Sequence, residues 1–303
     1  MTKLFGVTTA MVTPFTSDDT PDIDALAQLT EMLISHGVNC LYPCGTTGEM
    51  LRMTLAERKA IAETVIKTAK NRVPVFIHVG CMRQDDTIEL AQHAVAAGAQ
   101  GIGVVTPQFF GCNDTEMEEY FVAVANSIPT TMPVYLYNIP QCAANDLKTS
   151  VIKNIMARTT NVVGVKYSFA DMARTVEYLN IAEGFSVLHG ADKLFASMLT
   201  MGCDGTVSGC SCVFPEPYVK VYQAFKQGNL AEAQRWQAIA VRFGDLLTNG
   251  ANMAVFKAAL NIRGLNAGHM RKPQLDLNAE QVATLRQALT QLCSESGVSL
   301  TLN

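Results

Sequence analysis

The sequence predicts an α/β protein, namely a (β/α)8 TIM barrel followed by a C-terminal helical extension. Two observations lead to this fold class. Eight short apolar runs alternate with longer amphipathic stretches as far as Ser208. From Glu216 onward the strand signals stop, and only helical patterns follow. A doubly wound open sheet is the alternative, but no glycine-rich dinucleotide fingerprint follows the first apolar run.

The length of 303 residues suits a barrel of ~250 residues with an additional segment. We therefore expect a catalytic barrel domain over residues 1–225 and a helical extension over residues 226–303. No repeat, low-complexity tract or flexible linker separates the two parts, so the extension should pack against the barrel.

The elements follow from hydrophobic periodicity and from residues that start or stop helices. Asp22 and Asp114 are placed to cap helices, Thr54 and Glu57 have the spacing of a capping box, and Asn252 is expected just inside a late helix. The expected strands span residues 6–13, 38–42, 73–78, 101–106, 133–138, 161–166, 185–189 and 203–208. The expected helices span residues 22–36, 85–97, 115–127, 147–158, 172–182, 193–201, 218–226, 230–247, 251–262 and 279–293, with one more starting at 54.

The composition excludes several classes of function. The net charge of -4 gives no basic footprint, so a nucleic-acid partner is not expected. No apolar run approaches the ~18 residues that span a bilayer, and the first residues lack the features of a signal peptide. We therefore expect a cytoplasmic protein that acts on a small molecule and has no membrane partner.

The nine cysteines lie mostly in apolar segments, which is typical of reduced core thiols in a chain without a secretion signal. Cys210 and Cys212 lack a second ligand pair at the spacing of a zinc site, and the five histidines are dispersed. No metal site is expected.

Lys166 closes the apolar run 161–166, which has the composition of a strand buried on both faces. Burial of an amine costs free energy unless the amine is paired or neutral, and low dielectric favours the neutral form. A neutral amine attacks a carbonyl carbon to form a Schiff base. The alternatives are a lysine whose amine reaches solvent and a lysine paired with a carboxylate.

Other polar residues also follow the expected strands, at the barrel end where active sites lie. Two threonines between glycines, Thr46 and Thr47, offer hydroxyls and backbone N–H groups that suit a small carboxylate. Tyr137 could move protons beside the lysine amine. The alternatives are a helix-capping turn and an ordinary strand tyrosine. An amine, a phenol and an anion cradle at three strand ends together predict Schiff-base chemistry on a 2-oxo acid.

The chain resembles the N-acetylneuraminate lyase / dihydrodipicolinate synthase family of Schiff-base aldolases. The matching runs are 10–15, 45–49, 137–140, 164–166 and 204–205. The resemblance implies that Lys166 forms the Schiff base, and that Tyr137 and Thr47 act in the proton relay. It also implies that Gly45, Thr46 and Thr47 hold the pyruvate carboxylate, with the carbonyl of Val207 lining the pocket. A homotetramer without metal or organic cofactor is implied as well.

Departures from the family pattern bear on the substrate. Cys142 replaces an arginine that dihydrodipicolinate synthases use for their second substrate, and Phe109 and Phe110 lie where those enzymes have a relay tyrosine. N-acetylneuraminate lyases usually have serine at position 46 and an acidic residue at position 193, where this chain has Thr46 and Lys193.

Ser168 resembles the hydroxyl residue of the lyases, and Gln141 is a further candidate substrate ligand. This pocket suits a neutral or sugar-like aldehyde. We expect cleavage of a 2-oxo-3-deoxy (sugar) acid into pyruvate and an aldehyde. The alternatives are dihydrodipicolinate synthase and a catalytically weak protein that binds an oxo acid.

Overall fold

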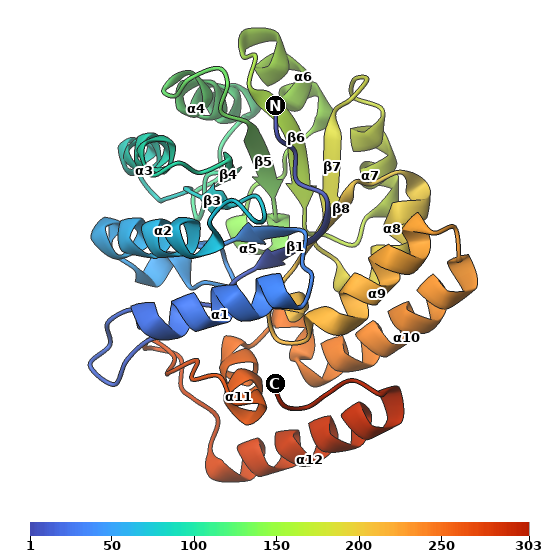
Figure 1. Ribbon diagram of the computed structural model, residues 1–303. Coiled ribbons are helices and arrows are strands. Elements are labelled where there is room, and N and C mark those ends of the chain that lie inside the picture. Colours follow the sequence, from blue (N-terminus) through green and yellow to red (C-terminus); the bar gives the residue numbers. More distant parts are fainter. Residues whose placement is uncertain (303) are drawn as a thin grey trace.

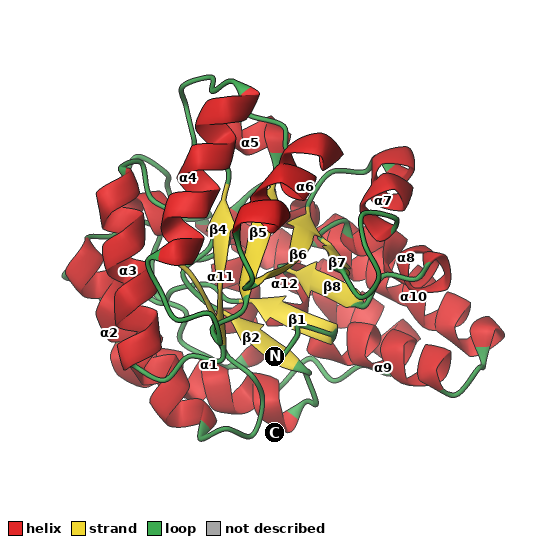
Figure 2. Ribbon diagram, turned by 90° about the horizontal axis from the view of Figure 1, so that it is seen from above, coloured by secondary structure: helices red, strands yellow, loops and turns green. Residues whose placement is uncertain are grey.

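Eight parallel strands occupy the centre of the computed structural model, which describes residues 1–302, and helices surround them (Figures 1 and 2). The strands are β1 (Gly6–Ala10), β2 (Cys40–Tyr42), β3 (Phe76–His78), β4 (Gly101–Val105), β5 (Val134–Asn138), β6 (Val162–Tyr167), β7 (Ser186–His189) and β8 (Gly205–Ser208). They are hydrogen-bonded in the order β2-β1-β8-β7-β6-β5-β4-β3. A parallel bridge between Leu41 and Val75 joins the two outer strands, so the predicted (β/α)8 barrel is confirmed.

The helices alternate with the strands and then continue alone. They are α1 (Ile23–Ser35), α2 (Leu55–Ala69), α3 (Gln84–Ala96), α4 (Asp114–Asn126), α5 (Pro140–Ala143), α6 (Thr149–Arg158), α7 (Met172–Leu179), α8 (Phe195–Met201), α9 (Pro215–Lys226), α10 (Leu230–Leu246), α11 (Met253–Arg263) and α12 (Ala279–Ser296). Short 3₁₀ turns are η1 (Met50–Arg52), η2 (Asp192–Leu194), η3 (Cys210–Cys212) and η4 (Thr248–Gly250).

Two of the predicted caps are confirmed and two predictions are corrected. Asp22 accepts a hydrogen bond from the N–H of Ala25, and Thr54 forms the capping box with Glu57. The cap of α4 is Asn113 rather than Asp114, because the extended backbone of Asn113 lets its side chain reach the third N–H of the helix. Asn252 likewise caps α11 from outside, accepting from the N–H of Ala254.

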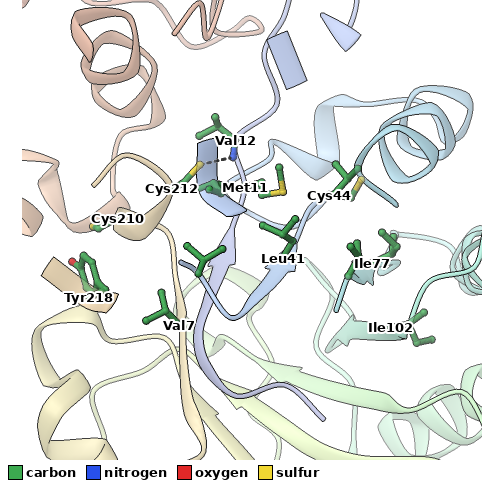
Figure 3. Packing of buried hydrophobic residues seen from close by; sticks show 14 of the residues in the cluster. Val7, Met11, Val12, Leu41, Cys44, Ile77, Ile102, Cys210, Cys212 and Tyr218 are labelled. Atoms are coloured by element: carbon green, nitrogen blue, oxygen red, sulfur yellow. Dashed lines mark hydrogen bonds between the residues drawn. The ribbon is translucent and has the colours of Figure 1, made fainter. Parts of the chain in front are cut away.

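The barrel interior and the space between strands and helices form separate apolar layers. Inside the barrel, aromatic side chains such as Tyr42, Phe76 and Tyr135 pack together. Glycines on β4 leave room for them: a Cβ on Gly103 would lie 1.7 Å from the hydroxyl oxygen of Tyr42. The outer layer continues from the strands into the helices, and Figure 3 shows part of it. The interior is therefore filled, and a substrate can enter only at an end.

The helices after the barrel lie on one side of it, with α12 outermost (Figure 1). Helix α10 packs on α9 and on α12, and α11 also contacts α12. Arg263 at the end of α11 is buried and forms an ion pair with Glu216 of α9. The C-terminal helices thus pack against the barrel, as the absence of a linker predicted.

All nine cysteines are free thiols, and six of them are buried. Within residues 1–302, no helix has both the length and the apolar character that crossing a membrane requires.

Candidate active site

Lys166 lies near the carboxyl end of β6, directly beside Tyr137 of β5 in the strand register. Only 4% of the lysine is exposed to solvent. Its Nζ lies 3.8 Å from the ring centroid of Tyr137 and 4.9 Å from that of Tyr42. Among the described residues, no carboxylate lies within 4.0 Å of this nitrogen. The amine is therefore buried and forms no ion pair within the described residues, and its role stays a prediction.

Tyr137 connects the amine to the threonine pair. The tyrosine is 2% exposed, and its hydroxyl lies 3.5 Å from the Oγ1 of Thr46. Thr47 lies toward the end of β8, since a Cβ on Gly209 would lie 3.2 Å from the Thr47 Oγ1. The threonine hydroxyls, the phenol and the amine come from the ends of β2, β5 and β6, as the strand-end argument predicted.

The segment that carries the threonines is held in a tight turn. The carbonyl of Gly45 accepts hydrogen bonds from the N–H groups of Gly48 and Met50, at 3.0 and 3.2 Å. Cys44 and Glu49 at either end have positive φ angles of 62°. Non-glycine residues adopt this conformation at a cost, so the surrounding contacts must hold the turn in place.

One of those contacts is Arg58 of α2, a buried guanidinium. It donates to the carbonyls of His78 and Gly80 at 2.7 and 2.9 Å, and to that of Cys44 at 3.4 Å. None of the ion pairs among residues 1–302 includes it. The site therefore contains a buried positive charge next to the turn that is predicted to bind a carboxylate, and its neighbours are carbonyls, the Cys81 thiol and the Nδ1 of His78.

His78 at the end of β3 completes the wall of the site. Its ring lies edge-on to that of Tyr137, with centroids 5.9 Å apart, and its Nδ1 is 3.2 Å from the carbonyl oxygen of Cys44. Burial, followed by the charges of Arg58 and Lys166, holds the pKa of His78 well below its usual value. The Nδ1 also lies 3.5 Å from the Nη2 of Arg58, so it is within hydrogen-bond distance of both a carbonyl acceptor and a guanidinium donor.

Sequence reasoning missed Tyr42, His78 and Arg58 as parts of this site. Tyr42 and His78 are the last residues of strands that were predicted. The alternation of side chains along those strands directs both of them into the barrel. That alternation was a usable signal. Arg58 had none, because its helical position gives no indication that it bends over the end of β3.

The remaining predicted residues lie around the same end of the barrel. Val207 is buried in the barrel interior. Gln141 of α5 donates its amide N–H to the carbonyl of Ser168, with an N–O distance of 2.7 Å. A Cβ on Gly190 would lie 2.0 Å from the Ser168 Oγ, so this hydroxyl faces the end of β7. The roles predicted for these three residues stay predictions.

The positions that depart from the family pattern are open to solvent. Phe109 is 76% exposed and packs edge-on against Phe110. Cys142 on α5 is exposed, and Lys193 forms an ion pair with Asp245 at 2.5 Å. Phe109 and Phe110 therefore supply no phenol, and Cys142 supplies no guanidinium.

A cleft of about 310 Å³ opens beside the threonine turn. It lies between the turn with η1, helix α5, and the segment from η4 to α11, with Gln274 at one side. Thr46, Arg52, Cys142 and Met253 are among its lining residues. Thr46 also contacts the hydroxyl of Tyr137, so the cleft and the site around Lys166 share this residue.

A buried amine beside a phenol at the mouth of a parallel barrel, together with relatives named as lyases and aldolases, defines this protein as a carbon–carbon lyase. The chain belongs to the dihydrodipicolinate synthetase family, whose family model matches residues 3–292.

Relatives with different named activities match nearly the whole chain. A 4-hydroxy-tetrahydrodipicolinate synthase of Sorangium cellulosum is 34% identical over 291 residues, which cover 95% of this chain and 96% of the relative. The Escherichia coli protein YagE, provisionally named 2-dehydro-3-deoxy-D-gluconate aldolase, is 31% identical over 95% of this chain and 96% of its own. The crystal structure of YagE in complex with pyruvate superimposes with a TM-score of 0.90, covering 96% of this chain and 99% of YagE at 30% identity.

Proposed function

We propose that this protein is a Schiff-base aldolase that reversibly cleaves a 2-oxo-3-deoxy sugar acid into pyruvate and an aldehyde. The observation that carries the proposal is the position of the Lys166 amine. It is buried without a carboxylate partner among the described residues and lies over the ring of Tyr137. An amine held beside a phenol at the mouth of the barrel can attack the ketone of an oxo acid to form a Schiff base.

The threonine turn binds the carboxylate of the oxo acid in this proposal. The hydroxyls of Thr46 and Thr47 and the backbone N–H groups of the turn, starting at Gly45, are the donors. The buried charge of Arg58 lies behind the same turn and favours an anion there. The carbonyl of Val207 lines the opposite side of the pocket, and Ser168 and Gln141 lie toward the aldehyde half.

Cleavage then takes place in balanced steps. The amine of Lys166 adds to the C2 ketone, whose oxygen leaves as water, and an iminium ion forms. The C4 hydroxyl loses its proton, the C3–C4 bond breaks, and its electron pair forms the C2–C3 double bond of an enamine as the iminium electrons return to nitrogen. The aldehyde leaves, C3 takes a proton, and water hydrolyses the imine to release pyruvate. Tyr137, with Thr47, carries the protons.

Position 142 and the relatives support a sugar-acid substrate. Cys142 is exposed beside the cleft and cannot form the charged hydrogen bonds of an arginine. YagE and YjhH of Escherichia coli carry the provisional names of 2-dehydro-3-deoxy acid aldolases, and YjhH is 32% identical over 237 residues. The alternative is condensation of pyruvate with aspartate semialdehyde, which the synthase names of other relatives favour. A third possibility is an oxo-acid-binding protein of low activity.

Borohydride trapping tests the mechanism directly. With pyruvate present, reduction should attach one pyruvate-derived group to Lys166, identified by intact mass and peptide mapping. Lys166→Ala should show neither the adduct nor turnover, whereas Lys148→Ala, which removes an exposed lysine on the barrel exterior, should behave like the unmodified protein. Absence of the adduct from the unmodified protein would overturn the proposal.

Pyruvate release from a panel of 2-oxo-3-deoxy acids identifies the substrate class. Efficient condensation of pyruvate with aspartate semialdehyde, and none with sugar aldehydes, would favour the synthase. An adduct without turnover on any member of the panel would favour the binding protein.

A further inference from the structure

We infer that the cleft beside Thr46 binds an anionic group, a carboxylate or a phosphate, at the far end of the aldehyde half of the substrate, and that Arg52 recognises it. The inference rests on the proposed function and narrows its substrate class. It also revises the expectation of a neutral aldehyde, which came from positions 141 and 142, because the cation Arg52 comes from another part of the chain.

The cleft lies where the aldehyde half must extend. Thr46 lines it and is 3.5 Å from the hydroxyl of Tyr137, whose ring lies against the amine of Lys166. Met50 packs in one cluster with Tyr137 and also lines the cleft. The barrel interior below the amine is filled with aromatic side chains. A substrate bound at C2 to Lys166 therefore directs its remaining carbons toward the mouth and the cleft.

Two cations share a single carboxylate in the cleft wall. The Oε2 of Glu49 accepts a hydrogen bond from Arg52 at 2.8 Å. Its Oε1 lies 2.7 Å from the Nζ of Lys257, and this contact is an ion pair whose geometry is not that of a hydrogen bond. The guanidinium of Arg271 forms ion pairs with Glu57 and with the exposed Asp19. Neither of these acids lines the cleft. Among the lining residues of the cleft, Arg52 is therefore the cation, and the Glu49 carboxylate beside it is shared with Lys257, which lies outside the cleft.

Arg52 retains free donors on the side of the cleft. Its side chain is 25% exposed, and one nitrogen, Nη1, makes its single side-chain hydrogen bond within the described residues, to Glu49. A guanidinium has five N–H donors in a planar fork that matches the two oxygens of a carboxylate or phosphate. The backbone carbonyl of Arg52 accepts from Arg271, which fixes the position of the turn.

The size of the cleft fits such a group. About 310 Å³ accommodates several carbons with a terminal carboxylate or phosphate, at the lower end of the range for small-ligand pockets. The substrate class is therefore a 2-oxo-3-deoxy acid with a second acidic group at its far end.

A matched pair of oxo acids tests the inference without requiring cleavage. 2-Oxoadipate and 2-oxohexanoate have the same length and the same reactive ketone, and differ only in a terminal carboxylate or methyl group. Each is trapped on the protein with borohydride over a range of concentrations. 2-Oxoadipate should reach half-saturation at a concentration about tenfold lower than 2-oxohexanoate, the scale of one charge-assisted contact.

Variants of Arg52 test whether this residue causes the preference for 2-oxoadipate over 2-oxohexanoate. Arg52→Gln should abolish it, and Arg52→Lys should retain part of it. Glu49 keeps its partner Lys257 in both variants, so the buried carboxylate is not left unpaired. Arg83→Gln is the control, because Arg83 is an exposed cation at the start of α3 outside the cleft, and should leave the preference unchanged. Pyruvate trapping should remain in all of these variants.

A second pair distinguishes phosphate from carboxylate. Glyceraldehyde 3-phosphate and glyceraldehyde are compared as acceptors for pyruvate. A preference for glyceraldehyde 3-phosphate, without a preference for 2-oxoadipate over 2-oxohexanoate, assigns the cleft to phosphate. Equal behaviour within both pairs, or a preference that persists in Arg52→Gln, would overturn the inference while the pyruvate adduct still formed. Loss of the pyruvate adduct from the unmodified protein would instead overturn the proposed function itself.

Discussion

At the scale of single residues, the site depends on how buried side chains pack around one amine. The amine of Lys166 lies over the rings of Tyr42 and Tyr137, and the hydroxyl of Tyr137 is 3.5 Å from the Oγ1 of Thr46. A phenol beside an amine can take up and return the protons that imine formation and carbon–carbon cleavage require. In the proposed mechanism the ring of Tyr137 packs against the amine, and its hydroxyl transfers protons.

Tyr137→Phe separates those two functions, because the ring remains and only the hydroxyl is lost. We expect kcat for cleavage to fall by ~10²–10⁴, the usual size of a proton-transfer contribution. Borohydride adducts should still form, more slowly, and the free energy of unfolding should change little. The measurement is steady-state release of pyruvate, with Tyr222→Phe as a control on an outer helix, α9. Unchanged kcat would remove Tyr137 from the mechanism.

His189 at the end of β7 carries a pH dependence that is independent of catalysis. The ring is buried against Tyr167, and its Nδ1 accepts a hydrogen bond from the N–H of Ala191 at 3.0 Å. Burial lowers the pKa of His189 to about 4. In the unfolded chain a histidine binds its proton near pH 6.5, so between about pH 6.5 and 4 the unfolded state binds more protons than the folded state.

The protein should therefore lose stability as the pH falls from 6.5 to about 4, and His189 alone should account for roughly 2–3 kcal/mol of that loss. His189→Gln should give a shallower dependence. Urea unfolding at several pH values measures this, and the difference between the two proteins should disappear above pH 7 apart from a constant offset. A parallel pH profile for the variant would contradict the assignment. The buried His78 acts in the same direction and remains in both proteins.

At the scale of elements, the threonine turn is attached to the helices after the barrel. Glu49 lies two residues after Thr47 in the same turn, and its carboxylate is buried against Lys257 of α11. Burial lowers the pKa of Lys257, and the charge of Glu49 opposes that fall. Lys257 also donates to the carbonyl of His269, so α11 and the following segment are held to the β2 turn.

Removing Glu49 should be costly, because the buried amine of Lys257 then has no ion-pair partner, whereas Lys257→Met leaves Glu49 paired with Arg52. Glu49→Gln should lower the free energy of unfolding by about 3–5 kcal/mol, and Lys257→Met should lower it by less. The double variant should lose less than the sum, since it leaves no isolated charge. Urea unfolding of the four proteins measures the coupling.

The exposed pair of Lys59 and Glu89 is the matched comparison, with an expected coupling of about 0–1 kcal/mol. Similar coupling energies for the two pairs would show that the Glu49–Lys257 contact does not hold the turn to α11.

At the scale of the whole molecule, the chain after the barrel returns to the end where the substrate is expected. Arg271 is bound to Glu57 and Asp19, residues near the other terminus, and its guanidinium lies 4.3 Å from the ring centroid of Phe15. Gly268 forms a bridge with Phe15. The C-terminal segment therefore forms part of the wall of the active-site end. A homotetramer and a cytoplasmic location remain predictions.

The extent to which the sequence predicted the site differs among its residues. The sequence predicted that Lys166, Tyr137 and the threonine turn lie together, because each lies at the end of a strand or just after one. The local pattern predicts those strands, and parallel strands of a barrel end at one face. The cap of α4 was misplaced by one residue, because Asn113 and Asp114 can both accept the same hydrogen bonds. Local side-chain chemistry does not choose between them, whereas the backbone conformation does.

The sequence by itself determined the order of strands and helices, and the strand ends that carry the amine, the phenol and the hydroxyls. These features depend on the period of apolar residues over a few turns or a single strand. The tertiary structure alone decided that Arg58 lies behind the turn without an acid, that Lys257 neutralises Glu49, and that Arg52 faces a cleft. Those contacts join residues far apart in the chain, and they exist only because barrel closure and helix packing bring the segments together.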